Sequence, residues 1–161
     1  MMFEITLICV GKMKERYYTD AAEEYRKRLS GHSKIEIIEI PEYRLPGNPS
    51  VTQIDEALRK ECESIRARLP GKACTAALCI EGREFSSTDF SGFLCDFAQK
   101  GISRIAFIIG GSYGLHDEIK AAADVKISMS KMTFPHHLSR VMILEQLYRA
   151  FSIAEGWKYH K

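Results

Sequence analysis

The sequence predicts an α/β fold in which a mainly parallel sheet is flanked by helices. Strand-like and helical patterns alternate along the whole chain, and the runs at 74–80 and 104–109 are almost continuously apolar. Continuous apolar strands separated by helices are typical of a parallel sheet that is covered on both faces. A chain of 161 residues also predicts one compact domain, spanning 1–161. We expect about five strands and about five helices.

The first half of the chain contains two strands and two helices by pattern. Alternating apolar residues predict a strand over 3–9, and apolar residues at helical spacing predict a helix over 17–29 that ends at Ser30-Gly31. A second strand is expected over 34–40, followed by a loop rich in Pro, Gly and Asn. Ser50 and Gln53 then have the spacing of a capping box. The next helix should bury a stripe formed by Ile54, Leu58, Cys62, Ile65 and Leu69.

The second half repeats the alternation. Strands are expected over 74–80, 104–109 and 125–129, with helices around 90–97 and over 117–123 between them. A last long helix is predicted by an apolar stripe that also contains one acid. Its members are Leu138, Val141, Leu144, Glu145, Tyr148 and Phe151.

Composition excludes several classes of protein. With 45% hydrophobic and 27% charged residues, the chain is neither disordered nor collagen-like. Its apolar runs are far shorter than the roughly 20 residues that span a bilayer, and the N-terminus has no secretory pattern, so we expect a cytoplasmic protein without a membrane segment. The five cysteines form no Cys-x-x-Cys pair. We interpret them as reduced core thiols, the alternative being one catalytic cysteine.

The net charge of +2 is unevenly distributed. Six Lys or Arg residues face only two acids from Lys126 onward, which makes the C-terminal third the basic end. Such a surface would attract phosphate backbones, although a solvated helix face with a frayed tail explains it equally well.

Three loops follow the carboxyl ends of predicted strands, where parallel sheets bind ligands. They span 81–85, 110–114 and 130–135. The glycine pair Gly110-Gly111 either lets a ligand approach the backbone or lets the chain turn sharply. The third loop has several apolar side chains, which suits a flat heterocycle held by main-chain hydrogen bonds. The chain has no Gly-x-x-x-x-Gly-Lys-Ser/Thr phosphate loop.

Polar residues on the last predicted helix are further candidates for a functional site. Glu145 falls on the apolar stripe, where it is either paired with Arg149 one turn later or is an orienting or proton-accepting group. His136 and His137 follow Pro135 at the helix start, and at most one of them is expected to face a site. No third residue at metal-ligand spacing supports a metal, so we expect none.

Four blocks of sequence resemble the ribosomal RNA large subunit methyltransferase H family, which belongs to the SPOUT class. They begin at Phe107 (FIIGGSYG), Ile127 (ISMSKMTFPHH), Leu144 (LEQLYRAF) and Tyr159 (YHK). The blocks occur in the right order with matching spacing, and the resemblance covers the whole chain.

This resemblance implies a fold with a C-terminal trefoil knot, a homodimer, and S-adenosylmethionine as cofactor. It also implies transfer of a methyl group to N3 of a pseudouridine in large-subunit ribosomal RNA, on assembled ribosomes. No metal and no membrane are implied. The residues that would contact the cofactor are Leu78, Gly110, Met129, Ser130, Lys131, Met132, Thr133 and Phe134.

Methylation at N3 requires a group that accepts the imide proton or stabilises the resulting anion. The sequence leaves the choice open within one set of residues: His136, Glu145, Arg149, Tyr159, His160 and Lys161. Trp157 or Tyr159 could stack on the extruded base. Two alternatives to this enzyme remain: a non-catalytic RNA-binding module that uses the basic end, and a small-molecule α/β enzyme with a nucleotide cofactor.

Overall fold

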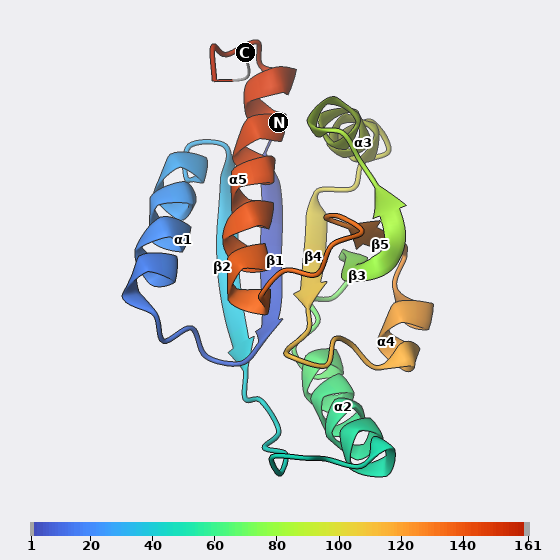
Figure 1. Cartoon of the computed structure of the whole chain (residues 1–161). Coiled ribbons are helices and arrows are strands. Elements are labelled where there is room, and N and C mark those ends of the chain that lie inside the picture. The colour runs from blue at the N-terminus through green and yellow to red at the C-terminus, as the bar shows by residue number, and fades with distance from the viewer. Residues whose placement is uncertain (1, 160–161) are drawn as a thin grey trace.

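Five parallel strands form the centre of the molecule (Figure 1). The structure is a computed structural model, and it describes residues 2–159. The strands lie in the order β2-β1-β4-β3-β5, and every neighbouring pair is parallel. Their bounds are β1 Phe3–Val10, β2 Ser33–Ile40, β3 Cys74–Glu84, β4 Arg104–Ile109 and β5 Val125–Ser128. The predicted parallel α/β class is confirmed.

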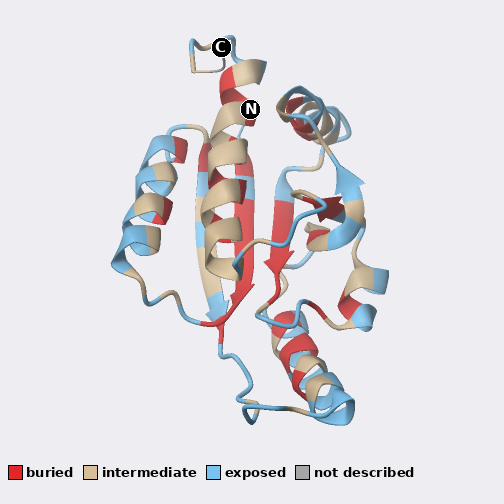
Figure 2. Ribbon diagram, in the orientation of Figure 1, coloured by how far each residue is buried: buried red, intermediate tan, exposed pale blue. Residues whose placement is uncertain are grey.

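Helices cover both faces of this sheet, which is why the central strands are apolar on both sides. Leu7 of β1 belongs to the core cluster under α1, α3 and α5, whereas its neighbour Ile8 belongs to the cluster under α2 and α4. Figure 2 shows buried residues concentrated on β1 and β4 at the centre of the sheet. The buried residues of α5 include Ile143, Leu144 and Leu147. The helices are α1 Arg16–Leu29, α2 Val51–Arg66, α3 Ser87–Gln99, α4 Asp117–Ala122 and α5 His136–Ala154.

The predicted capping box at the start of α2 is confirmed. The Ser50 hydroxyl accepts a hydrogen bond from the Gln53 amide N–H at 3.2 Å, and the Gln53 side chain accepts one from the Ser50 N–H at 2.9 Å. Two amide donors at the helix N-terminus, which have no partner inside the helix, are thereby satisfied.

Strand β3 is longer than its apolar pattern indicates. We expected it to end at Ile80, but it continues to Glu84 after an irregularity, so that Leu78 and Arg83 both pair with Ile127 of β5. Gly82 permits this arrangement because a Cβ there would lie 2.6 Å from the backbone N and C of Ile127. The predicted loop over 81–85 is therefore mostly a bulged strand, and α3 starts soon after it.

Helix α5 is fixed to the sheet by a buried arginine. Arg140 is 1% exposed, and its guanidinium donates to a Glu39 carboxylate oxygen at 2.8 Å and to the carbonyl oxygens of Val10 and Gly11 at 2.9 and 2.5 Å. These contacts hold the start of α5 against the carboxyl ends of β1 and β2. The trefoil knot implied by the family resemblance stays a prediction.

Candidate functional site

A cavity of about 750 Å³ lies at the carboxyl edge of the sheet, beyond β3, β4 and β5. The end of β3, the glycine loop after β4 and the segment after β5 all contribute to its wall, together with the first residues of α5. The three segments selected from sequence therefore meet at one hollow. Seven of the eight predicted cofactor residues line it: Leu78, Gly110, Met129, Ser130, Met132, Thr133 and Phe134.

The glycine loop is a tight turn of the backbone upon itself. A Cβ on Gly110 would lie 2.4 Å from the carbonyl carbon and oxygen of Gly114, and the Gly114 N–H donates to the Gly111 carbonyl at 3.0 Å. Gly114 has a φ of +78°, which glycine adopts without strain. The structure thus shows the sharp-turn role of Gly110, and this turn shapes the cavity wall.

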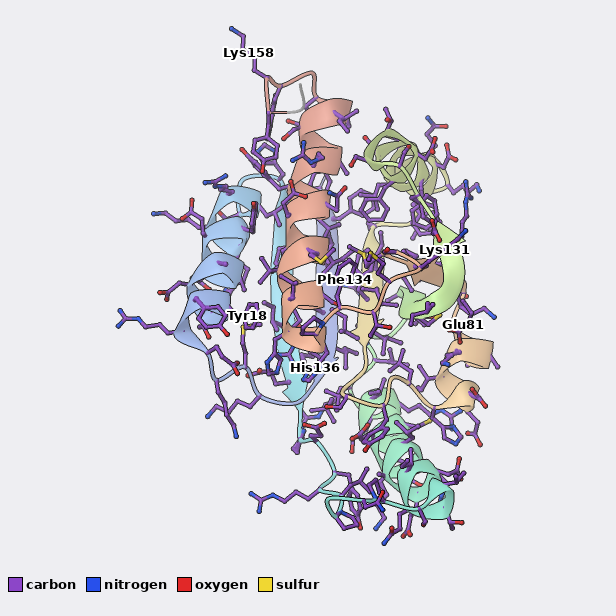
Figure 3. The ribbon with its side chains drawn as sticks, viewed as in Figure 1. Tyr18, Glu81, Lys131, Phe134, His136 and Lys158 are labelled. Atoms are coloured by element: carbon purple, nitrogen blue, oxygen red, sulfur yellow. The ribbon has the colours of Figure 1, made fainter. Side chains whose placement is uncertain are left out.

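The segment after β5 folds over the cavity as irregular backbone. Its turn is held by side-chain hydrogen bonds, since the Ser128 hydroxyl donates to the Ser130 carbonyl at 2.9 Å and the Met132 N–H donates to the Ser130 hydroxyl at 3.0 Å. In Figure 3, Phe134 lies beside α5, whereas Lys131 lies farther along the segment, toward β3. Lys131 is exposed and does not line the cavity.

Lys120, which the sequence analysis missed, lines the cavity together with Glu81 of the first predicted loop. Lys120 of α4 donates to a Glu81 carboxylate oxygen at 2.7 Å, and this hydrogen bond lowers the pKa of Glu81 and raises that of Lys120. Lys120 is separated by 39 positions from Glu81, so the local patterns of the chain carry no signal of this pair.

The cysteines are free thiols, two buried and three half-buried. Burial raises the pKa of Cys9 to about 12 and that of Cys74 to about 11. It also raises the pKa of Cys62 and of Cys79. A nucleophilic thiol needs a lowered pKa, so these four have the properties of core residues.

The candidate proton acceptors lie in two separate places. His136 lines the cavity, and burial lowers its pKa from the ordinary value of 6.5. Glu145 and Arg149 occur two to four turns later on α5, roughly 13 and 20 Å along the helix axis. In Figure 3, His136 is at the sheet-edge end of α5 and Lys158 is at the opposite end.

Glu145 forms the ion pair that its position predicts. Arg149 donates to its carboxylate at 2.9 Å through Nε and at 2.5 Å through a terminal nitrogen, and Gln146 donates at 2.6 Å. The Tyr159 hydroxyl donates to the same carboxylate at 3.3 Å, and burial raises the pKa of Tyr159 to about 12. His160 and Lys161 lie outside the described residues.

Among the described residues 126–159, the basic side chains do not gather on one surface, contrary to one of our two interpretations. Arg140 is buried under the sheet edge, and Arg149 is paired with Glu145. Lys131 and Lys158 are exposed at different places on the molecule (Figure 3). The surplus of basic residues in the sequence therefore forms no single basic patch within residues 126–159.

Within residues 2–159, one group of side chains has metal-ligating atoms close together, and it lies outside the cavity. Cys62, His116 and Glu118 place their ligand atoms within 4.8 Å of one another. Glu118 is already paired with Arg66 at 3.0 Å, and the His116 ring accepts a hydrogen bond from the Glu118 N–H at the start of α4. These contacts give the group a structural role between α2 and α4. None of the helices in this part of the chain has the length and apolarity needed to cross a membrane.

Comparison with known proteins shows which family this chain belongs to. A solved structure of a probable methylase family protein from Haemophilus influenzae Rd KW20 matches with a TM-score of 0.55 at 12% identity, covering 98% of this chain and 70% of that one. The family model described as a predicted SPOUT methyltransferase matches residues 3–160. The chain therefore belongs to the SPOUT methyltransferase family.

Curated relatives narrow the assignment within this family. The ribosomal RNA large subunit methyltransferase H of Streptococcus uberis is 44% identical over 98% of this chain and 99% of its own length. The protein of the same name from Clostridium acetobutylicum is 46% identical, also over 98% of this chain and 99% of its own. The family resemblance seen in the sequence is thereby confirmed.

Proposed function

We propose that this protein transfers a methyl group from S-adenosylmethionine to N3 of a pseudouridine in large-subunit ribosomal RNA, acting on assembled ribosomes in the cytoplasm. The observation that carries the proposal is the shared cavity, because three segments chosen as ligand loops from sequence line one hollow. Near-full-length relatives named for ribosomal RNA methylation support the choice of substrate.

The cavity suits S-adenosylmethionine in size and chemistry. Small-molecule and cofactor sites occupy roughly 300–1,000 Å³ and combine apolar walls with a few polar groups. Here Leu78, Leu115 and Phe134 provide apolar wall, while the backbone of the glycine loop and of the segment after β5 provides N–H and C=O groups. When bound, the cofactor supplies an electrophilic methyl group. The surrounding residues hold the adenosine and exclude water from one side.

Methyl transfer needs positioning of the acceptor nitrogen and removal of its proton. Among the candidate acceptors that the structure describes, His136 lines the cavity, and its lowered pKa favours the neutral imidazole that can accept a proton at pH 7. The Arg149 guanidinium and the Tyr159 hydroxyl belong to the separate cluster around Glu145. Within one protomer they do not share the cavity with His136, so we assign the proton acceptor to His136.

We also propose that the protein acts as a homodimer that pairs through α5. Val141 and Met142 of this helix are half-buried and line an apolar hollow of about 390 Å³ with Phe85, Phe90 and Met129. A second copy would remove this apolar surface from water. Light scattering coupled to size exclusion should give twice the chain mass, and Met142→Glu should shift it toward the single chain.

Calorimetry and a methyl-transfer assay test the main proposal. Calorimetric titration should show S-adenosylmethionine binding, and tritiated cofactor should label ribosomal RNA in ribosomes that lack the modification. Nuclease digestion and mass spectrometry should then locate the methyl group on a pseudouridine. Binding of RNA without cofactor binding would favour the RNA-binding module instead, and labelling of free nucleosides but not ribosomes would favour the small-molecule enzyme.

A further inference from the structure

A second hollow of about 880 Å³ adjoins the cavity at the same edge of the sheet. The loops after β1 and β2 line it on one side and α2 lines it on the other. Ser112, Tyr113 and His136 line both hollows, so the two are neighbours that share a wall. We call the second hollow the edge groove.

Three exposed cations line the edge groove. Lys12 and Lys14 follow β1, and Arg44 follows β2. Within residues 2–159 none of these three forms an ion pair, whereas Arg16, Arg28 and Arg59 on the neighbouring helices each have an acid one turn away. The groove therefore offers cations that an external anion can reach.

The acids of the edge groove are engaged by the protein itself. Glu61 is 7% exposed and accepts a hydrogen bond from the Tyr43 N–H at 3.1 Å, and burial raises its pKa. Glu42 accepts a hydrogen bond from the Ser112 hydroxyl at 3.3 Å. The lining contains three cations, Lys12, Lys14 and Arg44, against the two acids Glu42 and Glu61.

Two exposed tyrosines accompany these cations. Tyr43 is 40% exposed and is held by Lys60, whose ammonium donates to the Tyr43 hydroxyl at 3.0 Å and lies 4.5 Å from the ring centre. Tyr113 is 49% exposed at the wall shared with the cavity. Cations along a groove combined with exposed aromatic rings are the features that bind single-stranded nucleic acid, through its phosphates and its bases.

We propose that the edge groove binds the RNA strand that flanks the target base, with Lys12, Lys14 and Arg44 on its phosphates and Tyr113 stacked on a base next to the cavity. This inference rests on the proposed function for the identity of the RNA. It assigns the phosphate contacts to the N-terminal half of the chain, whereas the surplus of basic residues in the sequence pointed to the C-terminal third. The groove leads to the shared wall, so a strand bound there has its neighbouring nucleotide at the cavity.

The test compares two triple variants that lose the same number of charges. In the first, Lys12, Lys14 and Arg44 are changed to Gln. In the control, Lys34, Lys72 and Lys100 are changed to Gln, and these exposed residues lie at or just before the starts of β2, β3 and β4, at the opposite edge of the sheet. Filter binding with large-subunit ribosomal RNA in assembled ribosomes that lack the modification gives the dissociation constant at several salt concentrations, and calorimetry gives cofactor affinity.

The groove variant should bind this RNA at least about tenfold more weakly than the native protein, with the slope of log K against log salt reduced by about 2, as expected when three phosphate contacts are lost. Cofactor affinity should stay within about twofold. Tyr113→Ala should weaken binding by more than Tyr113→Phe, because only the alanine removes the ring. The opposite-edge variant should behave like the native protein.

Equal RNA binding by both triple variants, or no RNA binding by the native protein, would overturn the inference. The proposed function is judged separately, by methyl transfer. A native protein that binds RNA through the groove but labels no pseudouridine would overturn the proposed function and leave the groove intact.

Discussion

The Arg140 guanidinium lies 2.8 Å from the Glu39 carboxylate, and it is almost completely shielded from solvent. It also donates to two backbone carbonyls at the end of β1, while its Nε has no partner among residues 2–159. A cation in this position is tolerated because charge-assisted hydrogen bonds offset the loss of hydration. Arg140 therefore acts as a structural cation at the base of the edge groove.

Replacing this cation should destabilise the fold. Arg140→Met keeps the bulk of the side chain but removes the donors to Glu39, Val10 and Gly11, and we expect the free energy of unfolding to fall by about 3 kcal/mol. The melting temperature should drop by roughly 6–12 °C. Arg104→Gln is the matched control, because its pair with Glu4 is half-exposed and should contribute at most about 1 kcal/mol. Equal losses in both variants, measured by urea unfolding, would contradict this role.

Gly110→Ala should disrupt the cavity wall. The added Cβ would meet the Gly114 backbone at 2.4 Å, so the turn must open. We expect calorimetry to show S-adenosylmethionine affinity reduced at least about tenfold, or about 1.4 kcal/mol. Gly92→Ala in α3 is the control, since a Cβ there meets nothing within 4 Å. It should leave cofactor affinity unchanged and stabilise the helix by up to about 1 kcal/mol. Native affinity in Gly110→Ala would show that the turn does not shape the binding site.

The pH dependence of kcat should identify the proton acceptor. Burial lowers the pKa of His136, so the neutral imidazole persists below pH 6.5 and activity should fall only as the pH drops through that lowered pKa. His136→Gln should abolish this acid limb and reduce kcat at pH 7 by about a hundredfold. His32 lies beside Trp157, near the other end of α5. His32→Gln should therefore leave both the acid limb and kcat at pH 7 unchanged. If His136→Gln leaves the pH profile of kcat unchanged, another group is the proton acceptor.

Cys79 provides a chemical probe of the cavity. It lines the cavity and is half-buried, and burial raises its pKa, so its alkylation by N-ethylmaleimide should be slow and should accelerate at alkaline pH. Bound S-adenosylmethionine should slow this reaction several-fold. Cys95 in α3 does not line the cavity and should react at an unchanged rate. Peptide mass spectrometry measures both rates, and equal effects at the two cysteines would argue against occupation of this cavity.

Features set by local sequence were predictable. The helices, the five strands and the capping box at Ser50 depend on spacing within a few residues, and the structure confirms them. That the three predicted loops would lie together could also be predicted, because the carboxyl ends of parallel strands lie at the same edge of a sheet. The pairing of Glu145 with Arg149 also followed from helical spacing.

Features set by distant contacts were missed. Arg140 looks like one more basic residue in the sequence, and only its partners Glu39 and Gly11, more than a hundred positions away, make it a buried anchor. The extension of β3 past Ile80 depends on pairing with β5, since polar residues there break the apolar pattern. Lys12 and Lys14 of the edge groove are neighbours in sequence, but Arg44 and Tyr113 come from distant segments, so no local count of charge reveals the groove.

The register of the sheet also limits how the chain can acquire its structure during synthesis. Glu4 of β1 lies opposite Arg104 of β4, 100 positions later, whereas β1 and β2 are adjacent along the chain. The first two strands can associate early, but the inner edge of β1 has no complementary strand until most of the polypeptide has been made. A nascent chain halted before β4 would expose an unpaired apolar strand, which is the kind of surface that causes aggregation and engages chaperones.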